Sequence, residues 1–318
     1  MIDFRYHIVS LISVFLALAV GIVLGAGPLK ETIGQSLTGQ VNQLRQEKDT
    51  LRDERDSARR ERGVEQSFVD YAAAELLADR LTGQRVAIVC LTAVPAATVQ
   101  ALDARLGQAG AVVTGQVVLT DAWTDPDPSA AQYRRQLSDL LAPHLNPAPP
   151  GATTDVTLAT GLAQALTGAD SADPTKFGES AKDLLGILTT SDNALVTKNG
   201  DLTGPADAIV VVASLSKSAP KDSVQAARLA VVAAAQHESD GAVLVGDARG
   251  KGSLVDALLA DPTLAATVTS VSGISATSAQ VTVPMALAAQ IGGKVGHYGH
   301  GDGETVLPPT VTLPGAGG

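Results

Sequence analysis

The sequence contains very little sulfur, with one cysteine, Cys90, and two methionines among its 318 residues. A single cysteine cannot form a disulfide within the chain, and its position in the apolar run VAIVCL predicts a small, buried hydrophobic side chain. Cu(I) prefers thiolate and thioether ligands, and Cys90, Met1 and Met285 lie far apart in the sequence. These residues therefore argue against a high-affinity site for a soft metal.

Positive charge is also scarce, because 23 Lys and Arg residues face 33 Asp and Glu residues, a formal net charge of -10. A nucleic-acid partner would require a basic face to neutralise phosphates, so we expect no such partner. Aromatic residues make up only 3% of the chain, but 45% of it is apolar. That fraction excludes a wholly disordered chain and predicts a core built from Ala, Val and Leu.

A long run without charge lies near the N-terminus. Residues 8–27, IVSLISVFLALAVGIVLGAG, would span about 30 Å as a helix, which is enough to cross a bilayer. A cleaved signal peptide is the alternative, but the run is longer than usual and Pro28 would follow the cut. We expect a retained single-pass anchor in the plasma membrane, with residues 1–7 cytoplasmic and the chain from Lys30 outside. Charge does not decide this orientation, because Arg5 balances Lys30.

Residues 30–62 carry a heptad pattern that predicts a coiled-coil stalk. Apolar side chains at the seam positions a and d are Leu37, Val41, Leu44 and Leu51. Charged residues at later a positions, namely Lys48, Arg55 and Arg62, weaken the seam toward its C-terminal end. The pattern predicts a homodimer or pairing with another protein, and a solvated single helix is the alternative. Gly63 interrupts the pattern.

After the stalk, apolar runs alternate with helical patterns. Short apolar runs predict buried strands at residues 85–91, 111–119, 207–214 and 241–247. Helical patterns lie at residues 65–81, 96–110, 223–236, 254–259 and 278–290. The first two strands and the helix between them predict a parallel βαβ unit.

The middle of this region differs in composition from its flanks. Residues 121–204 are rich in Pro, Asp, Thr and Gly, and they show helical patterns near 130–141, 158–167 and 180–188 but no clear strand. The sequence therefore predicts an α/β, Rossmann-like domain over residues 64–303 with a helical insertion. Residues 304–318 are expected to form a disordered tail.

Enzyme motifs are weak, and we predict no catalytic residue. The stretch GDARGKGS at residues 246–253 follows a strand and precedes a helix, but its spacing departs from the phosphate-binding loop. An ordinary βα loop with Ser253 as helix N-cap explains it better. His237 lacks a second histidine four residues on, so it is not part of a zinc-protease motif.

Both ends of the chain resemble one protein family. The opening FRYHIVSLISVFLALAVGIVLGAGPL, the charged helix behind it and the closing GGKVGHYGHGDG are similar to the actinobacterial envelope family named for the mycobacterial copper transport protein MctB, which includes the corynebacterial SteB. The resemblance implies an envelope protein with an N-terminal anchor, an α/β domain outside the cytoplasm and a role in copper homeostasis. It also implies a dimeric partner in envelope assembly and division.

The stretch VGHYGHGDG, residues 295–303, offers the most plausible metal ligands in the sequence, His297, His300 and Asp302. Four glycines within it disfavour the helix that would align the two histidines, and few further ligands are near. We therefore expect a structural or partner-contacting loop and no cofactor, with copper implied by the resemblance alone. The residues assigned to this loop are Gly296, His297, Tyr298 and Gly299.

The expected function is that of a noncatalytic dimeric scaffold anchored in the envelope and bound to an envelope or division protein. A pore or transport component for copper efflux is the alternative, and an anion- or nucleotide-binding domain is a third hypothesis. A pore is disfavoured because residues 8–27 contain only Ser10 and Ser13 as polar members and no pattern of barrel strands is present.

Overall fold

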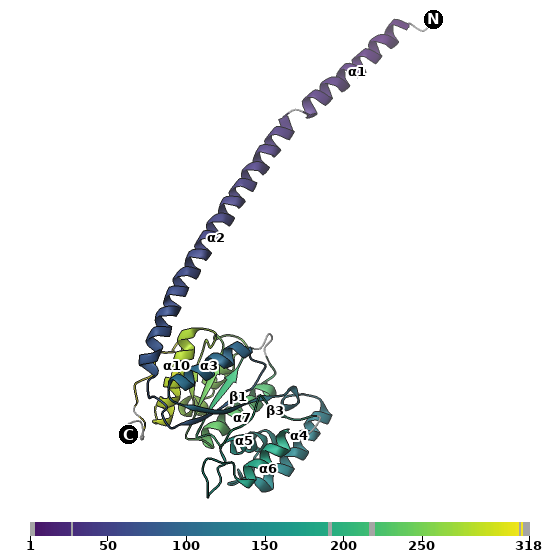
Figure 1. Cartoon of the computed structure of the whole chain (residues 1–318). Coiled ribbons are helices and arrows are strands. Elements are labelled where there is room, and N and C mark those ends of the chain that lie inside the picture. The colour runs from purple at the N-terminus through teal and green to yellow at the C-terminus, as the bar shows by residue number, and fades with distance from the viewer. Residues whose placement is uncertain (1–3, 27, 190–192, 216–219, 312, 314–318) are drawn as a thin grey trace. The chain divides into compact units, whose positions relative to one another are not determined.

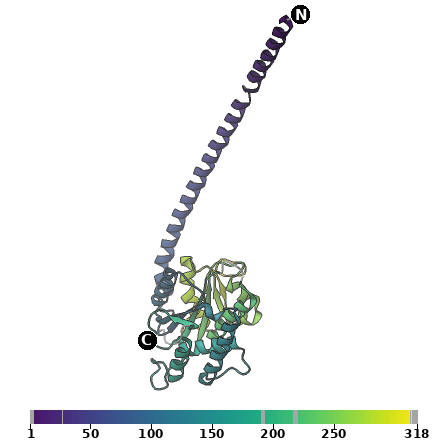
Figure 2. The same ribbon diagram turned by 90° about the vertical axis from the view of Figure 1, so that its right-hand side faces the viewer.

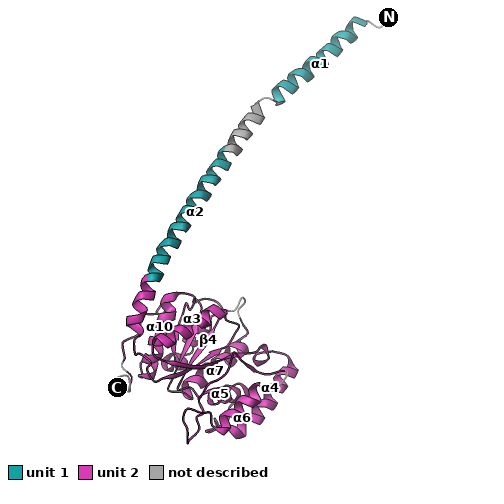
Figure 3. Cartoon of the chain, viewed as in Figure 1, with its two compact units in different colours: residues 1–67 teal, residues 68–318 magenta. Residues whose placement is uncertain are grey.

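The computed structural model describes residues 4–26, 28–189, 193–215, 220–311 and 313, with the side chains of residues 26–38 outside the description. The chain divides into two compact units, residues 1–67 and residues 68–318 (Figure 3).

Unit 1 begins with helix α1 (Phe4–Ala26). Its segment Phe4–Gly25 is the one helix in the described ranges that is long and apolar enough to cross a membrane, with a mean hydropathy of 2.8. None of this segment is buried inside the protein. The helix begins at Phe4 rather than at residue 8, so the part of the predicted cytoplasmic segment that is described, residues 4–7, is helical.

Helix α2 (Pro28–Leu77) runs through the predicted stalk and ends in unit 2. It passes Gly63 without a break, which corrects the predicted interruption. A glycine inside a helix costs only about 1 kcal/mol relative to alanine, and the 50-residue helix tolerates it. Pairing of α2 with another helix stays a prediction.

Unit 2 is built on a seven-stranded sheet in the order β3-β2-β1-β4-β5-β6-β7. Four strands confirm the apolar runs of the sequence: β1 (Arg85–Cys90), β2 (Val112–Leu119), β4 (Ala208–Ala213) and β5 (Gly241–Gly246). Three strands were not predicted: β3 (Val196–Lys198), β6 (Thr269–Val271) and β7 (His297–Tyr298). All neighbours pair in parallel except β3, which is antiparallel to β2.

Helices cover both faces of the sheet, because the strand side chains alternate between two cores. One core combines Val86 and Ile88 of β1 with α3 (Ala96–Gln108), α10 (Thr277–Ile291) and the last turns of α2. The other combines Ala87 and Val89 with the helices of the opposite face, which are α5 (Thr154–Thr167), α7 (Asp222–His237) and α8 (Leu254–Ala260). Figures 1 and 2 show α3 and α10 on one side of the strands and α5 and α7 on the other. The prediction of a mixed α/β domain is confirmed.

The predicted helical insertion lies between β2 and β3. It contains α4 (Pro128–Leu141), α5 and α6 (Glu179–Thr189), with short 3-10 helices at Asp121–Trp123 and Ala142–His144. Residues 157–166 of α5 are all buried, because α5 packs against α4, α6 and α7. Strand β3 corrects the expectation that residues 121–204 contain no strand. It was missed because two of its three residues are exposed and only Val196 is buried.

The segment after residue 303 also differs from the prediction. Thr305 forms a parallel bridge with Tyr298, and Leu313 is buried in the core beside α10. Within the expected disordered tail, Pro308 and Leu313 are buried, whereas Val306 and Leu307 are exposed. The sequence does not predict these contacts. Residues 306–313 contain two prolines and a mixture of apolar and polar residues, and their partners lie on distant elements such as α10.

Candidate functional site

A cluster of hydrogen-bonded polar residues lies in unit 2 where β5, β6 and β7 end. These strands are parallel neighbours, so the loops that leave them, residues 247–253, 272–276 and 299–305, meet at the same edge of the sheet. Ligand sites of open α/β sheets collect at this edge, outside the carboxyl ends of the strands. The helix α9 (Pro262–Thr267) precedes β6 and supplies one backbone contact from the side.

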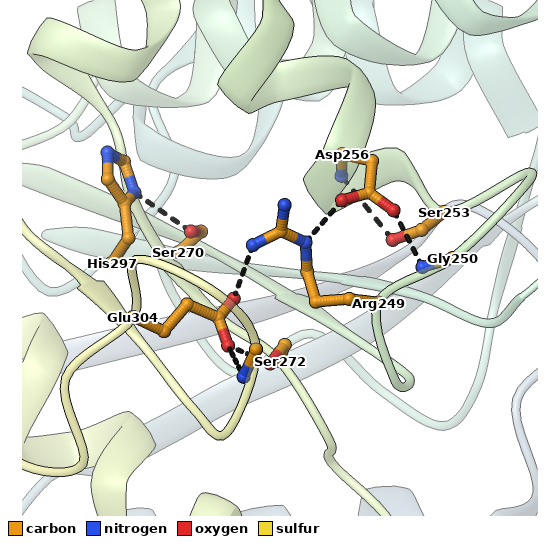
Figure 4. A network of polar contacts seen from close by, with 9 residues as sticks. Arg249, Gly250, Ser253, Asp256, Ser270, Ser272, His297 and Glu304 are labelled. Atoms are coloured by element: carbon orange, nitrogen blue, oxygen red, sulfur yellow. Dashed lines mark hydrogen bonds and ion pairs between the residues drawn. The ribbon is translucent and has the colours of Figure 1, made fainter.

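His297 on β7 uses both ring nitrogens for hydrogen bonds within the domain. Its Nε2 lies 3.1 Å from the carbonyl oxygen of Ala265, and its Nδ1 lies 2.9 Å from Oγ of Ser270 (Figure 4 shows the second contact). A carbonyl oxygen only accepts, so Nε2 carries the proton and donates, while Nδ1 accepts from the Ser270 hydroxyl. Burial lowers the pKa of His297, which favours this neutral form. Both ring nitrogens are therefore already engaged in hydrogen bonds.

Glu304 connects the final loop to the two loops beside it. Its side chain is fully buried, and its carboxylate accepts hydrogen bonds from Ser272 Oγ at 2.6 Å and from the Gly301 backbone N–H at 2.8 Å. Its other oxygen lies 3.2 Å from Nη1 of Arg249. Three donors thus satisfy a carboxylate that would otherwise be costly to bury.

Arg249 joins Glu304 to the start of α8. It pairs through Nε with Asp256, whose other oxygen accepts the Gly250 backbone N–H at 2.6 Å. Although burial lowers the pKa of Arg249, its hydrogen bonds to Asp256 and Glu304 raise it overall. Figure 4 shows Arg249 between the two carboxylates, and we call Arg249, Asp256, Ser272 and Glu304 the carboxylate network. Charge-assisted bonds of this kind fix the positions of loops.

Gly299 allows the network to close. Its φ is +148°, and a Cβ at this position would overlap Oγ of Ser272 and Oε2 of Glu304. Beside it, Tyr298 is buried, and burial raises the pKa of its hydroxyl. Gly296 also has no room for a side chain, because a Cβ there would meet the Tyr298 ring.

The other two candidate ligands of this loop are not drawn into the network. His300 and Asp302 are exposed, and neither makes a hydrogen bond or ion pair among the residues that the structure covers. In the same covered ranges, no group of three His, Cys, Asp or Glu side chains is arranged to hold a metal ion. The His297 ring is hydrogen-bonded to Ser270 and Ala265 and to neither of the other two candidate ligands.

No local sequence pattern indicates the carboxylate network. The sequence places Arg249 in a glycine-containing loop after a strand, and it places Glu304 at the start of the expected tail. The interpretation of Ser253 as N-cap of α8 is confirmed, because its Oγ accepts the Asp256 backbone N–H. An acidic residue directly after a glycine-rich loop is the one local signal for Glu304, and it is shared by many turns.

A hollow of about 360 Å³ lies elsewhere in unit 2, between α3, β1 and β2. Cys90 lies in its floor and is buried, as predicted, and burial raises the pKa of its thiol. Nε2 of Gln116 lies 3.3 Å from the sulfur, and Asn199 Nδ2 donates to Gln116 Oε1 at 2.8 Å. A protonated, buried thiol is a poor nucleophile and a poor metal ligand in this state.

Replacing His297 and His300 together by alanine is expected to leave metal content unchanged, because the His297 ring is occupied by hydrogen bonds and His300 has no described co-ligand. Metal analysis of the folded full-length protein after exposure to Cu(II) or Zn(II) checks this. The matched control is His237→Ala, which removes an exposed histidine at the end of α7. A stoichiometric ion present in the unmodified protein and the control but absent from the double variant would contradict the expectation.

Comparisons with known proteins agree over nearly the whole length. The model of a family described as "Copper transport outer membrane protein, MctB" matches residues 1–309. The chain is 32% identical over 316 residues to proteins named "Copper transporter MctB" from Mycobacterium tuberculosis and Mycobacterium bovis, covering 95% of this chain and 98% of each relative. A protein of the same name from Mycobacterium leprae is 31% identical over 331 residues, covering 99% of this chain and 100% of the relative.

Proposed function

The chain belongs to the MctB family of copper transport proteins, and on that premise we propose that it is a membrane-anchored, noncatalytic dimeric scaffold of the cell envelope. The scaffold would serve envelope assembly or division. The assignment to copper homeostasis comes from the family, which is described as copper transport.

The observation that carries the dimer is the apolar stripe on α2. In the single chain, Val41, Leu44 and Leu51 are 41%, 63% and 64% exposed. They recur at a and d positions of a helix that is otherwise highly charged, and burial against a second helix would remove this apolar surface from water. Leu37, the first predicted seam residue, has its side chain outside the described part.

The anchor is inferred from α1, and its orientation is inferred from the family resemblance. Its apolar length suits a single crossing of the plasma membrane, and the resemblance to envelope proteins favours unit 2 on the outer side. We interpret the sheet of unit 2 as Rossmann-like, because parallel strands run outward from β1 and β4 with helices on both faces. The reversed, three-residue β3 departs from that pattern at one edge.

The noncatalytic role is supported by how the candidate residues are used. The His297 ring is hydrogen-bonded to Ser270 and Ala265, and the carboxylate network joins the loops that follow β5, β6 and β7. A general base would need a lone pair within reach of a substrate. These contacts instead support a shaped surface held in place for a protein partner.

A copper transport component is the second candidate, favoured by the names of the relatives. The soft ligands among the described residues, Cys90 and Met285, are both buried and lie on β1 and α10. Under the scaffold proposal, liposomes that contain the full-length protein are expected to pass copper no faster than empty liposomes. A protein-dependent copper flux that scales with protein density would support the transport candidate instead.

Replacing Leu44 and Leu51 by aspartate is expected to convert the protein from dimer to monomer. Each dimer would hold four carboxylates in an apolar seam, which raises the dissociation constant by at least about a hundredfold. Sedimentation of the full chain in detergent measures this, with Gln46→Asp and Asp53→Asn on the outer face of α2 as the control. An unmodified chain that is monomeric at tens of micromolar, about the range of weak zippers, would contradict the proposal.

A further inference from the structure

Charged residues flank the apolar seam of α2 in a regular arrangement. In the heptad that places Val41 at a and Leu44 at d, the g positions are acidic and the e positions are basic. The g residues are Glu47, Glu54 and Glu61, and the e residues are Arg45, Arg52 and Arg59. All six are exposed on the helix. Side chains at e and g border the seam and set the choice and the direction of a partner helix.

We propose that α2 pairs in parallel and in register with α2 of a second copy of this chain, that its e and g charges specify the parallel direction, and that its apolar seam residues specify the register. In that arrangement, Glu47 of one copy faces Arg52 of the other, and Glu54 faces Arg59, because each g position meets the e position of the next heptad. Two-fold symmetry gives four ion pairs. The inference rests on the proposed dimer and adds its direction and register.

The same charges exclude the opposite direction. In an antiparallel pair, g faces g and e faces e, so Glu54 would meet glutamates and Arg52 would meet arginines. A shift by one heptad in a parallel pair keeps four pairs of opposite charge, but it places Val41 beside Lys48 and Leu51 beside Ala58. The e and g charges therefore select the parallel direction, and the matched apolar layers of Val41, Leu44 and Leu51 select the unshifted register.

The single chain leaves most of these charges available for a second copy. Glu54 and Arg59 make no hydrogen bond or ion pair among the described residues, and Glu47 only accepts from the Gln43 amide at 2.9 Å. Arg52 has one ion pair, with Asp49 at 3.8 Å, and both side chains are more than half exposed. Such a contact is weak and exchangeable.

The paired segment of α2 ends before the helix packs against its own domain. Continuing the heptad places Val69 and Leu76 at a positions, and both pack against the core of their own domain. Arg62, the a residue before them, is exposed. From about residue 69 onward the a residues contact their own domain, so only the part of α2 before this residue can pair with a second copy.

The charges at the a positions fit the same arrangement. Lys48 and Arg55 directly follow Glu47 and Glu54 in the sequence. In a parallel pair, a cationic side chain at a can reach the glutamate at g of the second copy, which offsets the repulsion between two cations at the seam. The charged a positions thus lower the affinity, but in a parallel pair they lie beside glutamates of the second copy.

Charge reversal of the full-length protein in detergent tests the proposal. Glu47→Arg with Glu54→Arg makes both flanks basic, and Arg52→Glu with Arg59→Glu makes both acidic. Each variant alone is expected to have a dimer dissociation constant at least about tenfold above that of the unmodified chain. Mixing the two is expected to restore the affinity as a heterodimer, because all four pairs then have opposite signs. Unchanged unfolding by Trp123 fluorescence shows that the domain is intact.

Cysteine cross-linking reads the register directly. Leu44→Cys and Leu51→Cys, tested separately with diamide, are each expected to form a disulfide-linked dimer, because equivalent d positions adjoin in a parallel, unshifted pair. Asp53→Cys on the outer face is the control and is expected to stay monomeric on a denaturing gel, and native Cys90 is buried. An antiparallel pair can bring only one of the two d positions beside its own copy.

The outcomes separate the inference from the proposed dimer. An unmodified chain that sediments as a monomer removes both. A dimer in which neither charge variant is weakened, or in which mixing gives no heterodimer, removes the charge-specified direction and leaves the dimer standing. Cross-linking of Asp53→Cys, or of only one d position, removes the parallel, unshifted arrangement and leaves the dimer standing.

Discussion

Replacing Gly299 by valine is expected to destabilise unit 2 by about 3 kcal/mol or more. The backbone φ of +148° is strained for a β-branched residue, and the new Cβ would overlap the Ser272 hydroxyl and the Glu304 carboxylate. Either the carboxylate network opens and leaves Glu304 poorly satisfied, or the loop moves away from β6. The one tryptophan of the chain, Trp123, is buried in unit 2, so its fluorescence during urea unfolding of the full-length protein measures the loss.

Gly303 provides the matched control for this experiment. It lies in the same loop with a φ of +79°, but a Cβ there would meet no atom within 4 Å. Gly303→Ala is expected to cost about 1 kcal/mol from backbone strain alone. If the valine at 299 and the alanine at 303 lower the free energy of unfolding equally, close packing around Gly299 is not what holds the loop.

Replacing Glu304 by alanine is expected to lower the free energy of unfolding by about 2–4 kcal/mol. The change removes an acceptor for Ser272, Gly301 and Arg249, and it leaves a partly buried guanidinium with Asp256 alone. Glu304→Gln is expected to cost less, because the amide oxygen still accepts one donor. Urea unfolding followed by Trp123 fluorescence measures both variants.

Asp302→Ala is the control for the glutamate. Asp302 is exposed, two residues away and without a hydrogen bond in the described part of the chain, so its removal is expected to change stability by less than about 0.5 kcal/mol. A Glu304→Ala variant as stable as Asp302→Ala would show that the network does not anchor the segment after β7.

The sequence was most informative where one local pattern decides the structure. The strands β1, β4 and β5 are runs of buried Val, Ile, Leu and Ala in the middle of the sheet, and their apolar character shows without any knowledge of neighbours. The strands β6 and β7 contain Thr269, Ser270 and His297, whose polar groups are satisfied by partners such as Gln290 and Ala265. Since those partners lie more than 20 residues away, no short window of sequence shows these two strands.

The same reason explains how far the candidate site could be predicted. The glycines of residues 295–303 pointed to a loop with unusual backbone, and Gly299 does adopt a positive φ. Which side chain they make room for depends on Ser272 and Arg249, which precede Glu304 by 32 and 55 residues. A metal site was a reasonable hypothesis from His297, His300 and Asp302 together, but proximity in sequence does not show that the His297 ring is already bonded on both sides.

Native mass spectrometry of the full-length protein released from membranes tests the central claim most directly, because one spectrum reports the oligomer, the N-terminus and any bound metal. We expect a dimer of chains that retain residues 1–27, with no stoichiometric copper. A monomer, a chain that begins near Pro28, or a copper ion bound at a fixed ratio would contradict the anchored, metal-free scaffold.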